Sequence, residues 1–231
     1  MSKSVFVTAT GTDIGKTYIS GLLVKKMRDL SYNCGYYKPV LSGAVRRSDG
    51  SLIPGDCADV IETSALDLDP SDCVSYCFDE ALSPHLAAKR RGVKIDKNII
   101  KSDFIRLSQK YDYMVVEGAG GIACPFNLDG ETLLLSEIIN VLGLDIIIVA
   151  DAGLGTINSA LLTFEYAKSH SINVCGFIIN NYDENDFMHA DNKIQIERLT
   201  GVKVLAAVGK NAEDLNMDEN GLLKIFIERE A

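Results

Sequence analysis

The residues with the most evident chemistry lie near the N-terminus, in segment 8–17. The strand-like apolar run 5–7 precedes this segment, and Gly15, Lys16 and Thr17 lead into a helical pattern. In such a turn, backbone N–H groups and the helix N-terminus face anionic oxygens. The lysine reaches the β- and γ-phosphates, and the threonine hydroxyl takes a Mg²⁺ ligand position. The segment therefore indicates a phosphate-binding loop.

The loop departs from the strict pattern G-x-x-x-x-G-K-[ST], because position 10 is threonine and the nearest earlier glycine is Gly11. The alternative interpretation is an ordinary strand-to-helix turn that contains Gly-Lys-Thr. The strand and helix patterns on the two sides of the segment favour the phosphate-binding loop.

Polar or glycine-rich sequence also follows the other predicted strands. Lys38 precedes a proline at the end of the second strand, and Glu117 precedes the glycine-rich stretch 118–121. A further glycine-rich helix entry follows at 151–158, and Asn180 follows the next strand. A single charge near a strand end is usually a solvated surface group. Polar or glycine-rich sequence at four strand ends together predicts a binding site at the carboxyl edge of a sheet.

Strand and helix patterns alternate along the chain. Continuous apolar runs such as 146–149 are typical of strands that are buried on both faces of a parallel sheet. We expect strands at 5–8, 35–38 (ended by Pro39), 113–116, 146–150, 177–179 and 202–206, and helices at 16–30, 97–109, 131–141, 156–169 and 191–200. The prediction is one α/β domain over 1–231, a doubly wound, mostly parallel sheet with helices on both faces.

Composition limits the classes of protein to consider. A chain of 231 residues that is 47% hydrophobic can bury a large core. The formal charge of −9 argues against nucleic acid as the main partner, and no apolar stretch reaches the length of a membrane span. The opening apolar run is too short for a signal peptide. The six cysteines lack metal-ligand spacing, so we expect buried thiols, no bound metal at cysteine, and a cytoplasmic location.

The motifs taken together resemble the dethiobiotin synthetases, ATP-dependent enzymes of biotin biosynthesis. The resemblance covers nearly the whole chain. It rests on segments that occur in the order and spacing of that family. They are the segment from 6–8 to 15–17, residues 37–39 together with 42–43, and 83–85, 116–121, 154–158 and Asn180. The chain departs from the family pattern at Ala9, where a glycine is usual, at Asp13, where glutamate is usual, and at 205–209, where a proline-containing segment often lies beside the adenine.

The resemblance implies a P-loop NTPase-like fold and a specific reaction. The substrates would be 7,8-diaminopelargonate, CO₂ and ATP. One amine captures CO₂ as a carbamate, and the γ-phosphoryl group of ATP activates the carbamate as a mixed anhydride. The second amine then closes a cyclic urea, and ADP and phosphate leave. Each step gathers negative charge near the γ-phosphate, so cations and backbone N–H groups should dominate the site.

The resemblance also implies roles for individual residues. Lys16 would bridge the phosphates, Lys38 would stabilise the carbamate and the transferring phosphoryl group, and these two are the expected catalytic residues. The expected ATP contacts are Asp13, Ile14, Gly15, Lys16, Thr17, Tyr18, Asp56, Glu117, Gly118, Ala119, Gly120 and Asn180. The expected substrate contacts are Ser42, Gly120, Gly121, Leu154, Gly155, Thr156, Ile157 and Asn158. Mg²⁺ would be held by Thr17, Asp56 and Glu117, with Asp59 as the alternative to Asp56.

In the family, the helix start at 154–158 belongs to a second subunit, where its free N–H groups bind the carboxylate of the substrate. The resemblance therefore implies a homodimer with a shared site. Residues can serve a structural purpose instead: Asp56 as a helix N-cap, Asn180 as a buried turn residue, and the glycines as tight-turn positions.

Two other functional classes share some of these features. A regulatory ATPase of the partitioning or septum-placement type has a similar loop and sheet, but usually carries an extra early lysine that 9–14 lacks. Such ATPases often end in a basic or amphipathic helix, whereas 220–231 is mixed in charge. A non-catalytic nucleotide-binding domain is the second alternative, and Lys38 and Glu117 argue against it.

Overall fold

The computed structural model describes residues 2–226. Within them, seven parallel strands form the main sheet in the order β11-β10-β9-β1-β6-β2-β5. These strands are β1 (Lys3–Ala9), β2 (Cys34–Ser42), β5 (Val74–Phe78), β6 (Tyr113–Glu117), β9 (Asp145–Asp151), β10 (Val174–Asn180) and β11 (Val204–Val208). Two short antiparallel pairs lie outside the sheet: β3 (Val45–Arg46) with β4 (Leu52–Ile53), and β7 (Pro125–Asn127) with β8 (Leu133–Leu134).

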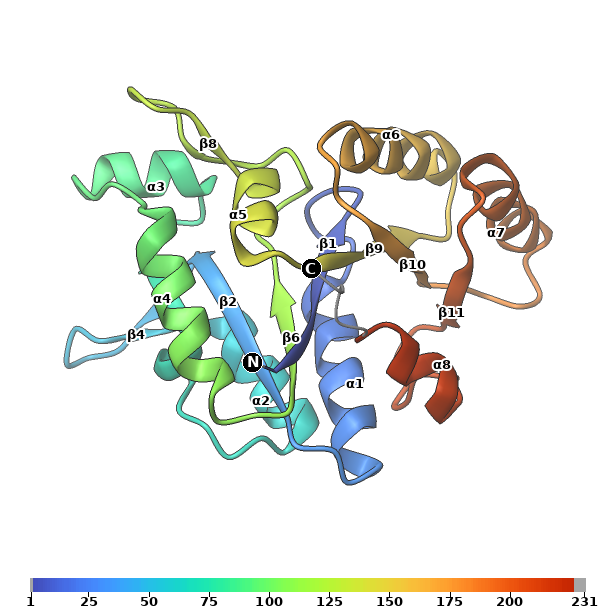
Figure 1. Cartoon of the computed structure of the whole chain (residues 1–231), viewed down its shortest axis with the longest axis horizontal. Helices are drawn as coiled ribbons and strands as arrows, with labels where there is room; N and C mark the ends of the chain where they lie inside the picture. The colour runs from blue at the N-terminus through green and yellow to red at the C-terminus, as the bar shows by residue number, and fades with distance from the viewer. Residues whose placement is uncertain (1, 227–231) are drawn as a thin grey trace.

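Helices cover both faces of the sheet (Figure 1). They are α1 (Lys16–Asp29), α2 (Gly55–Ser64), α3 (Pro84–Arg90), α4 (Lys97–Ser108), α5 (Leu135–Leu142), α6 (Thr156–Ser169), α7 (Phe187–Thr200) and α8 (Glu219–Lys224), with a 3₁₀ turn at Pro70–Cys73. Among residues 2–226, none of the helices is long and apolar enough to cross a membrane. The doubly wound parallel architecture confirms the predicted fold class.

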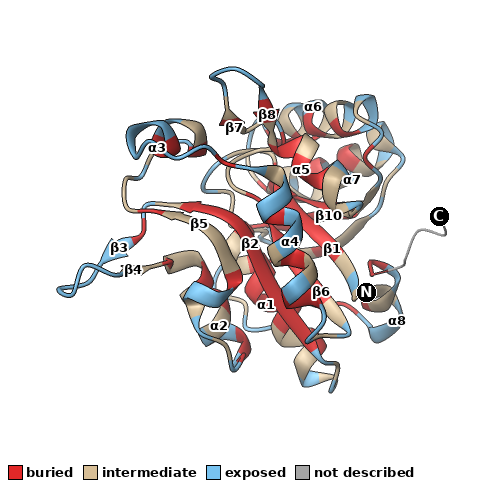
Figure 2. Cartoon of the chain, turned by 60° about the vertical axis from the view of Figure 1, so that its left-hand side comes forward, coloured by how far each residue is buried: buried red, intermediate tan, exposed pale blue. Residues whose placement is uncertain are grey.

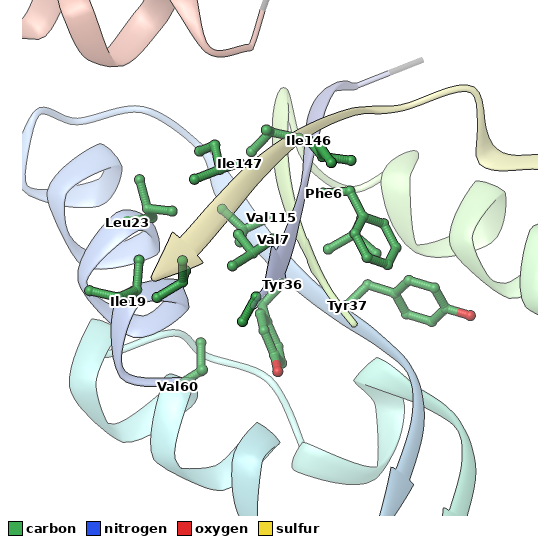
Figure 3. Close-up of a cluster of buried hydrophobic side chains, with 14 of the residues drawn as sticks. Phe6, Val7, Ile19, Leu23, Tyr36, Tyr37, Val60, Val115, Ile146 and Ile147 are labelled. Carbon is green, nitrogen blue, oxygen red and sulfur yellow. The ribbon is translucent and has the colours of Figure 1, made fainter. Parts of the chain in front are cut away.

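The central strands are buried because their side chains are apolar on both faces. Val5, Val7 and the run 146–150 have no exposed surface, as expected of a parallel strand between two helical layers. Figure 2 shows the buried residues concentrated in these strands, with exposed residues on the outer turns of the helices. Ile19 and Leu23 of α1 pack on one side of β1, and Phe6 and Tyr37 lie on the other (Figure 3).

Several predicted boundaries were wrong: the helix predicted at 191–200 begins at Phe187, and the strand predicted at 202–206 is Val204–Val208. Two further differences have a clear structural reason. Pro39 does not end the second strand, which continues to Ser42. The register explains this: β2 pairs with β6 from Cys34 to Tyr37 and with β5 from Lys38 onward, so at Pro39 the strand is paired on one side only. That is the setting in which a sheet tolerates proline.

The helix predicted at 131–141 begins four residues later, at Leu135, because 133–134 form β8. The carboxylate of Glu137 accepts the backbone N–H of Leu134 at 2.8 Å, and this bond marks the N-terminus of the helix. By contrast, α6 has the bounds predicted from the sequence. The single domain predicted over 1–231 includes residues 1 and 227–231, which lie outside the described residues.

Candidate active site

Five neighbouring strands end at one edge of the sheet, in the order β10, β9, β1, β6 and β2. This edge gathers the loop after β1 with the strand-end residues that the sequence singled out. A pocket of about 450 Å³ opens there. It is lined by Thr12, Asp13, Gly15, Lys16, Thr17, Lys38, Val40, Leu41, Ser42, Asp56, Glu117, Gly118, Ala119 and Gly120. Most of the residues predicted for ATP and Mg²⁺ therefore share one cavity.

Glu117 lies at the centre of the polar contacts in this pocket and has no exposed surface. Its Oε1 atom accepts hydrogen bonds from Lys38 Nζ at 2.6 Å and from Thr17 Oγ1 at 2.9 Å. Its Oε2 atom accepts a hydrogen bond from the Tyr36 hydroxyl at 2.8 Å. The contacts join the end of β6 to the start of α1 and to β2, so one buried carboxylate holds three elements of the site together.

Lys38 is also buried and has two acidic partners. Besides Glu117, Asp56 Oδ2 lies 2.7 Å from Lys38 Nζ, and the Asp56 side chain is 44% exposed. Burial alone would lower the pKa of Lys38, but the charges of Glu117 and Asp56 outweigh burial and raise the pKa above its usual value. Lys38 therefore stays protonated at neutral pH. Asp59 is exposed and does not line the pocket, so the geometry favours Asp56 over Asp59 as the acid that faces the site.

Lys16 is the second buried cation of the pocket. Its Nζ donates to the carbonyl oxygen of Gly11 at 3.1 Å, across the loop that it belongs to. Burial lowers the pKa of Lys16, and the positive charge of Lys38 lowers it further. Asp13, in the same loop, has a positive φ of 59°, which a non-glycine residue rarely adopts outside a functional or tightly held turn. The Lys16 ammonium is thus held in the pocket by a contact within its own loop.

Asn180 and Tyr18, both predicted to contact ATP, hold neighbouring segments in place in this structure. Asn180 Nδ2 donates to the carbonyl oxygen of Ile14 at 2.9 Å. Gly15 has a φ of 98°, and a Cβ atom there would lie 2.1 Å from Asn180 Nδ2, so only glycine fits beneath the amide. The Tyr18 hydroxyl donates to the carbonyl oxygen of Ala212. Contact of either side chain with a nucleotide stays a prediction.

The donor set of the pocket fits a hard divalent cation. The Thr17 hydroxyl and the Glu117 carboxylate are already in contact, and Asp56 lies on the other side of Lys38. Within residues 2–226, no group of three or more His, Cys, Asp or Glu side chains is placed to hold a metal by itself. One or two carboxylates with a hydroxyl suit Mg²⁺, which keeps phosphate and water ligands.

The predicted substrate residues fall into three places. Ser42 and Gly120 line the pocket, whereas Gly121 does not and instead packs near the carbonyl oxygen of Ala9. The stretch 154–158 lies outside the pocket, at the N-terminus of α6. Leu154 is 94% exposed there. The structure of one chain therefore does not bring 154–158 to the pocket.

The sequence analysis missed Tyr36 as a member of the site. It lies within the strand predicted at 35–38 and was given no role. A signal was present: side chains two residues apart on a strand lie on the same face, so Tyr36 shares a face with Lys38. Three residues of the pocket wall were also missed, namely Thr12, Val40 and Leu41. Val40 has the same spacing from Lys38 as Tyr36, and Thr12 lies within the predicted loop 8–17, whereas Leu41 has neither signal.

Solved structures share this fold at low sequence identity. A ParA-family ATPase from Chlorobium tepidum is 15% identical with a TM-score of 0.55, covering 97% of this chain and 92% of that chain. The septum site-determining protein MinD of Pyrococcus horikoshii, solved with Mg-ADP, is 16% identical with a TM-score of 0.56, covering 91% and 82%. A family model described as an AAA domain matches residues 3–216. The fold and the loop place the chain in the P-loop NTPase-like class.

Curated relatives define the family within that class. The ATP-dependent dethiobiotin synthetase of Clostridium botulinum is 46% identical over 228 residues, which is 99% of this chain and 100% of the relative. The enzyme of a second strain of that organism is 48% identical over 204 residues, 88% of this chain and 89% of the relative. The chain belongs to the family of ATP-dependent dethiobiotin synthetases. The likeness to partitioning and septum-placement ATPases is one of fold alone.

Proposed function

We propose that this ATP-dependent ligase converts 7,8-diaminopelargonate, CO₂ and ATP to dethiobiotin, ADP and phosphate, with Mg²⁺ as cofactor. The observation that carries the proposal is the pair of lysines in one pocket. Lys16 comes from the loop after β1 and Lys38 from β2, and both line the cavity that Thr17 and Glu117 also reach. Two cations and a helix N-terminus are suited to the charge that a phosphoryl transfer develops.

The proposed reaction has three bond-forming steps. An amine of the substrate attacks CO₂ and loses a proton, which gives a carbamate. A carbamate oxygen attacks the γ-phosphorus of ATP, the bond to the β–γ bridging oxygen breaks, and ADP leaves. The second amine then attacks the carbonyl carbon and loses a proton as the bond from that carbon to the phosphate oxygen breaks. Phosphate leaves, and the cyclic urea is complete.

The residues of the pocket have distinct proposed roles. Lys16 binds the β- and γ-phosphates and leaves the Gly11 carbonyl to do so. Lys38, held protonated by Glu117 and Asp56, neutralises charge on the carbamate and on the transferring phosphoryl group. Ser42 and the backbone N–H groups near Gly120 orient the substrate. Mg²⁺ would be held by Thr17, Glu117 and Asp56 and would neutralise charge on the phosphate oxygens.

We propose further that the enzyme is a cytoplasmic homodimer whose site is completed by the partner subunit. The substrate carboxylate lies several carbons from its amines, so a second anion site is needed away from the pocket. The N-terminus of α6 offers one: Gly155 has a φ of 91°, and the buried Thr156 hydroxyl has no hydrogen-bond partner within residues 2–226. Leu154 and Phe187 are 94% and 88% exposed near the starts of α6 and α7, which suits burial against a second copy.

The experiment that tests the proposed reaction is phosphate release measured with and without the diamine. We expect release to require 7,8-diaminopelargonate and bicarbonate as the CO₂ source, and to give one phosphate for each cyclic urea detected by mass spectrometry. A regulatory ATPase would release phosphate without the diamine. A non-catalytic nucleotide-binding protein would release none under either condition, and either result would contradict the proposal.

A further inference from the structure

The two oxygens of the Glu117 carboxylate have different surroundings. Oε1 is shared by Lys38 and Thr17, the residues nearest to the proposed phosphate and metal positions. Oε2 is bound by the Tyr36 hydroxyl at 2.8 Å and faces into the protein. Tyr36 is itself fully buried, so its hydroxyl has no access to bulk water as an alternative partner. The pairing therefore fixes which oxygen of Glu117 faces the pocket.

The alternation of β2 produces this arrangement. Tyr36 and Lys38 lie two residues apart and share the face of the strand that packs against α2, and both contact Glu117. Tyr37, between them, points to the opposite face (Figure 3). There its hydroxyl donates to the carbonyl oxygen of Ile100 in α4 at 3.0 Å and lies 2.6 Å from Ser75 Oγ. Of these two adjacent buried tyrosines, Tyr36 contacts the site and Tyr37 does not.

We propose that Tyr36 is a positioning residue of the reaction: its hydroxyl holds Glu117 Oε2 and so presents Oε1 alone to Lys38, Thr17 and the metal position. The inference rests on the proposed role of Glu117 in the Mg²⁺-nucleotide site. A carboxylate can rotate about the bond to its side chain, and a fixed partner on one oxygen limits that rotation. Partners that orient a ligand in this way typically change metal affinity by about 10- to 100-fold.

The chemistry of the two groups assigns the donor. A carboxylate oxygen accepts hydrogen bonds, so the proton of the bond between Tyr36 and Glu117 Oε2 comes from the phenol hydroxyl. A phenylalanine at position 36 would keep the ring in its place and remove only this donor.

The test compares Tyr36→Phe with the matched control Tyr37→Phe. Each variant removes one hydroxyl from a buried ring of the same strand, so each should lower the melting temperature. The measured quantity is the affinity of Mn²⁺ for the protein–ADP complex, followed by electron paramagnetic resonance. This assay needs neither the diamine nor turnover, so its outcome is independent of whether the proposed synthetase reaction is right.

We expect Tyr36→Phe to weaken Mn²⁺ binding by about tenfold or more, and Tyr37→Phe to leave it unchanged. In a Glu117→Gln background, Tyr36→Phe should have no further effect on Mn²⁺ affinity, because the two residues act through one contact. Equal Mn²⁺ affinities in Tyr36→Phe and the wild type would overturn the proposal, as would equal losses in the two tyrosine variants.

A measurement on the wild-type protein covers the case in which Tyr36→Phe does not fold. With a ¹³C label placed at Cζ of position 36 alone by site-specific incorporation of labelled tyrosine, the Tyr36 resonance should shift when MgADP is added, because its partner Glu117 changes contacts. In a second sample labelled only at position 37, the Tyr37 resonance should stay in place. A stationary Tyr36 resonance at saturating MgADP would rule out the positioning role.

Discussion

Lys16 and Lys38 bring two ammonium groups to the same pocket although one comes from the loop after β1 and the other from the middle of β2. After burial, the charge of Lys38 is the next cause of the lowered pKa of Lys16. The charge of Lys38 is compensated by two carboxylates, whereas Lys16 donates to a backbone carbonyl oxygen. The buried charge of Lys16 therefore lowers the stability of the free protein more than that of Lys38 does. A bound phosphate would compensate the charge of Lys16.

Replacing Lys16 by methionine should raise the stability of the free protein and abolish activity. Burial of the charged amine is unfavourable, and methionine fills similar space without charge. The gain should amount to a few degrees in Tm, since in chains of this size about 1 kcal/mol corresponds to roughly 2–4 °C. The affinity for ATP should fall sharply, because a phosphate contact is lost. Normal turnover with an unchanged KM for ATP would contradict the assignment of the loop.

The stability difference between wild type and Lys16→Met should also depend on pH. The pKa of Lys16 is lower in the folded than in the unfolded chain, so the folded chain binds fewer protons between the two values and wild-type stability rises with pH there. Below the folded-state pKa the cost of the buried charge is fully present. The difference in Tm between Lys16→Met and the wild type should therefore shrink as the pH rises above neutrality. A difference that grows with pH would contradict the lowered pKa of Lys16.

Replacing Lys38 by methionine should reduce turnover far more than ATP affinity, because its charge acts mainly in the transition state. The variant should also be destabilised by about 3–5 kcal/mol, since Glu117 would remain buried without its cation. The double variant Lys38→Met/Glu117→Gln should recover much of that stability but no activity. Denaturant titration and calorimetric ATP binding measure the two effects separately, and loss of ATP binding with turnover intact would remove Lys38 from the chemistry.

The acids of the pocket should differ in their effect on metal dependence. Glu117→Gln and Asp56→Asn should each raise the Mg²⁺ concentration needed for half-maximal activity, whereas the exposed Asp59→Asn serves as the control and should not. The reason is position: Asp56 contacts Lys38 at the pocket, and Asp59 lies one helical turn away on the outside of α2. An effect of Asp59→Asn without one of Asp56→Asn would reverse the choice between the two acids.

Two inactive chains should restore activity when mixed, if the site is shared across a twofold axis. One chain carries Lys38→Ala, and the other carries Gly155→Ala with Asn158→Ala at the start of α6. In a hybrid dimer, one of the two sites combines the undamaged parts of both chains. Random exchange of equal amounts should thus recover roughly a quarter of wild-type activity. A monomer at assay concentration, or no recovery in proven hybrids, would exclude the shared site.

The central strands and the phosphate-binding loop could be predicted from sequence because their signals are local. A run such as 146–149 and the Gly15–Thr17 turn need no knowledge of distant residues. Edge strand β5 was missed because its residues are mostly half-buried, which weakens the apolar pattern. The Thr17–Glu117 and Lys38–Glu117 contacts join residues far apart in the chain, and the neighbouring positions of β1, β6 and β2 in the sheet bring them together. The sequence therefore predicted the residues that make these contacts, but not which of them contact each other.

The position of β1 in the middle of the sheet has a consequence for the order in which the site is built during synthesis. The loop is made well before either neighbour of β1, because β1 pairs with β6 at 113–117 and with β9 at 145–149. Asn180, which holds Ile14, is made later still. Parallel strands so distant in sequence pair slowly. A nascent chain therefore carries the loop long before it has a nucleotide site, and ATP or ADP can stabilise the fold only once most of the chain has been made.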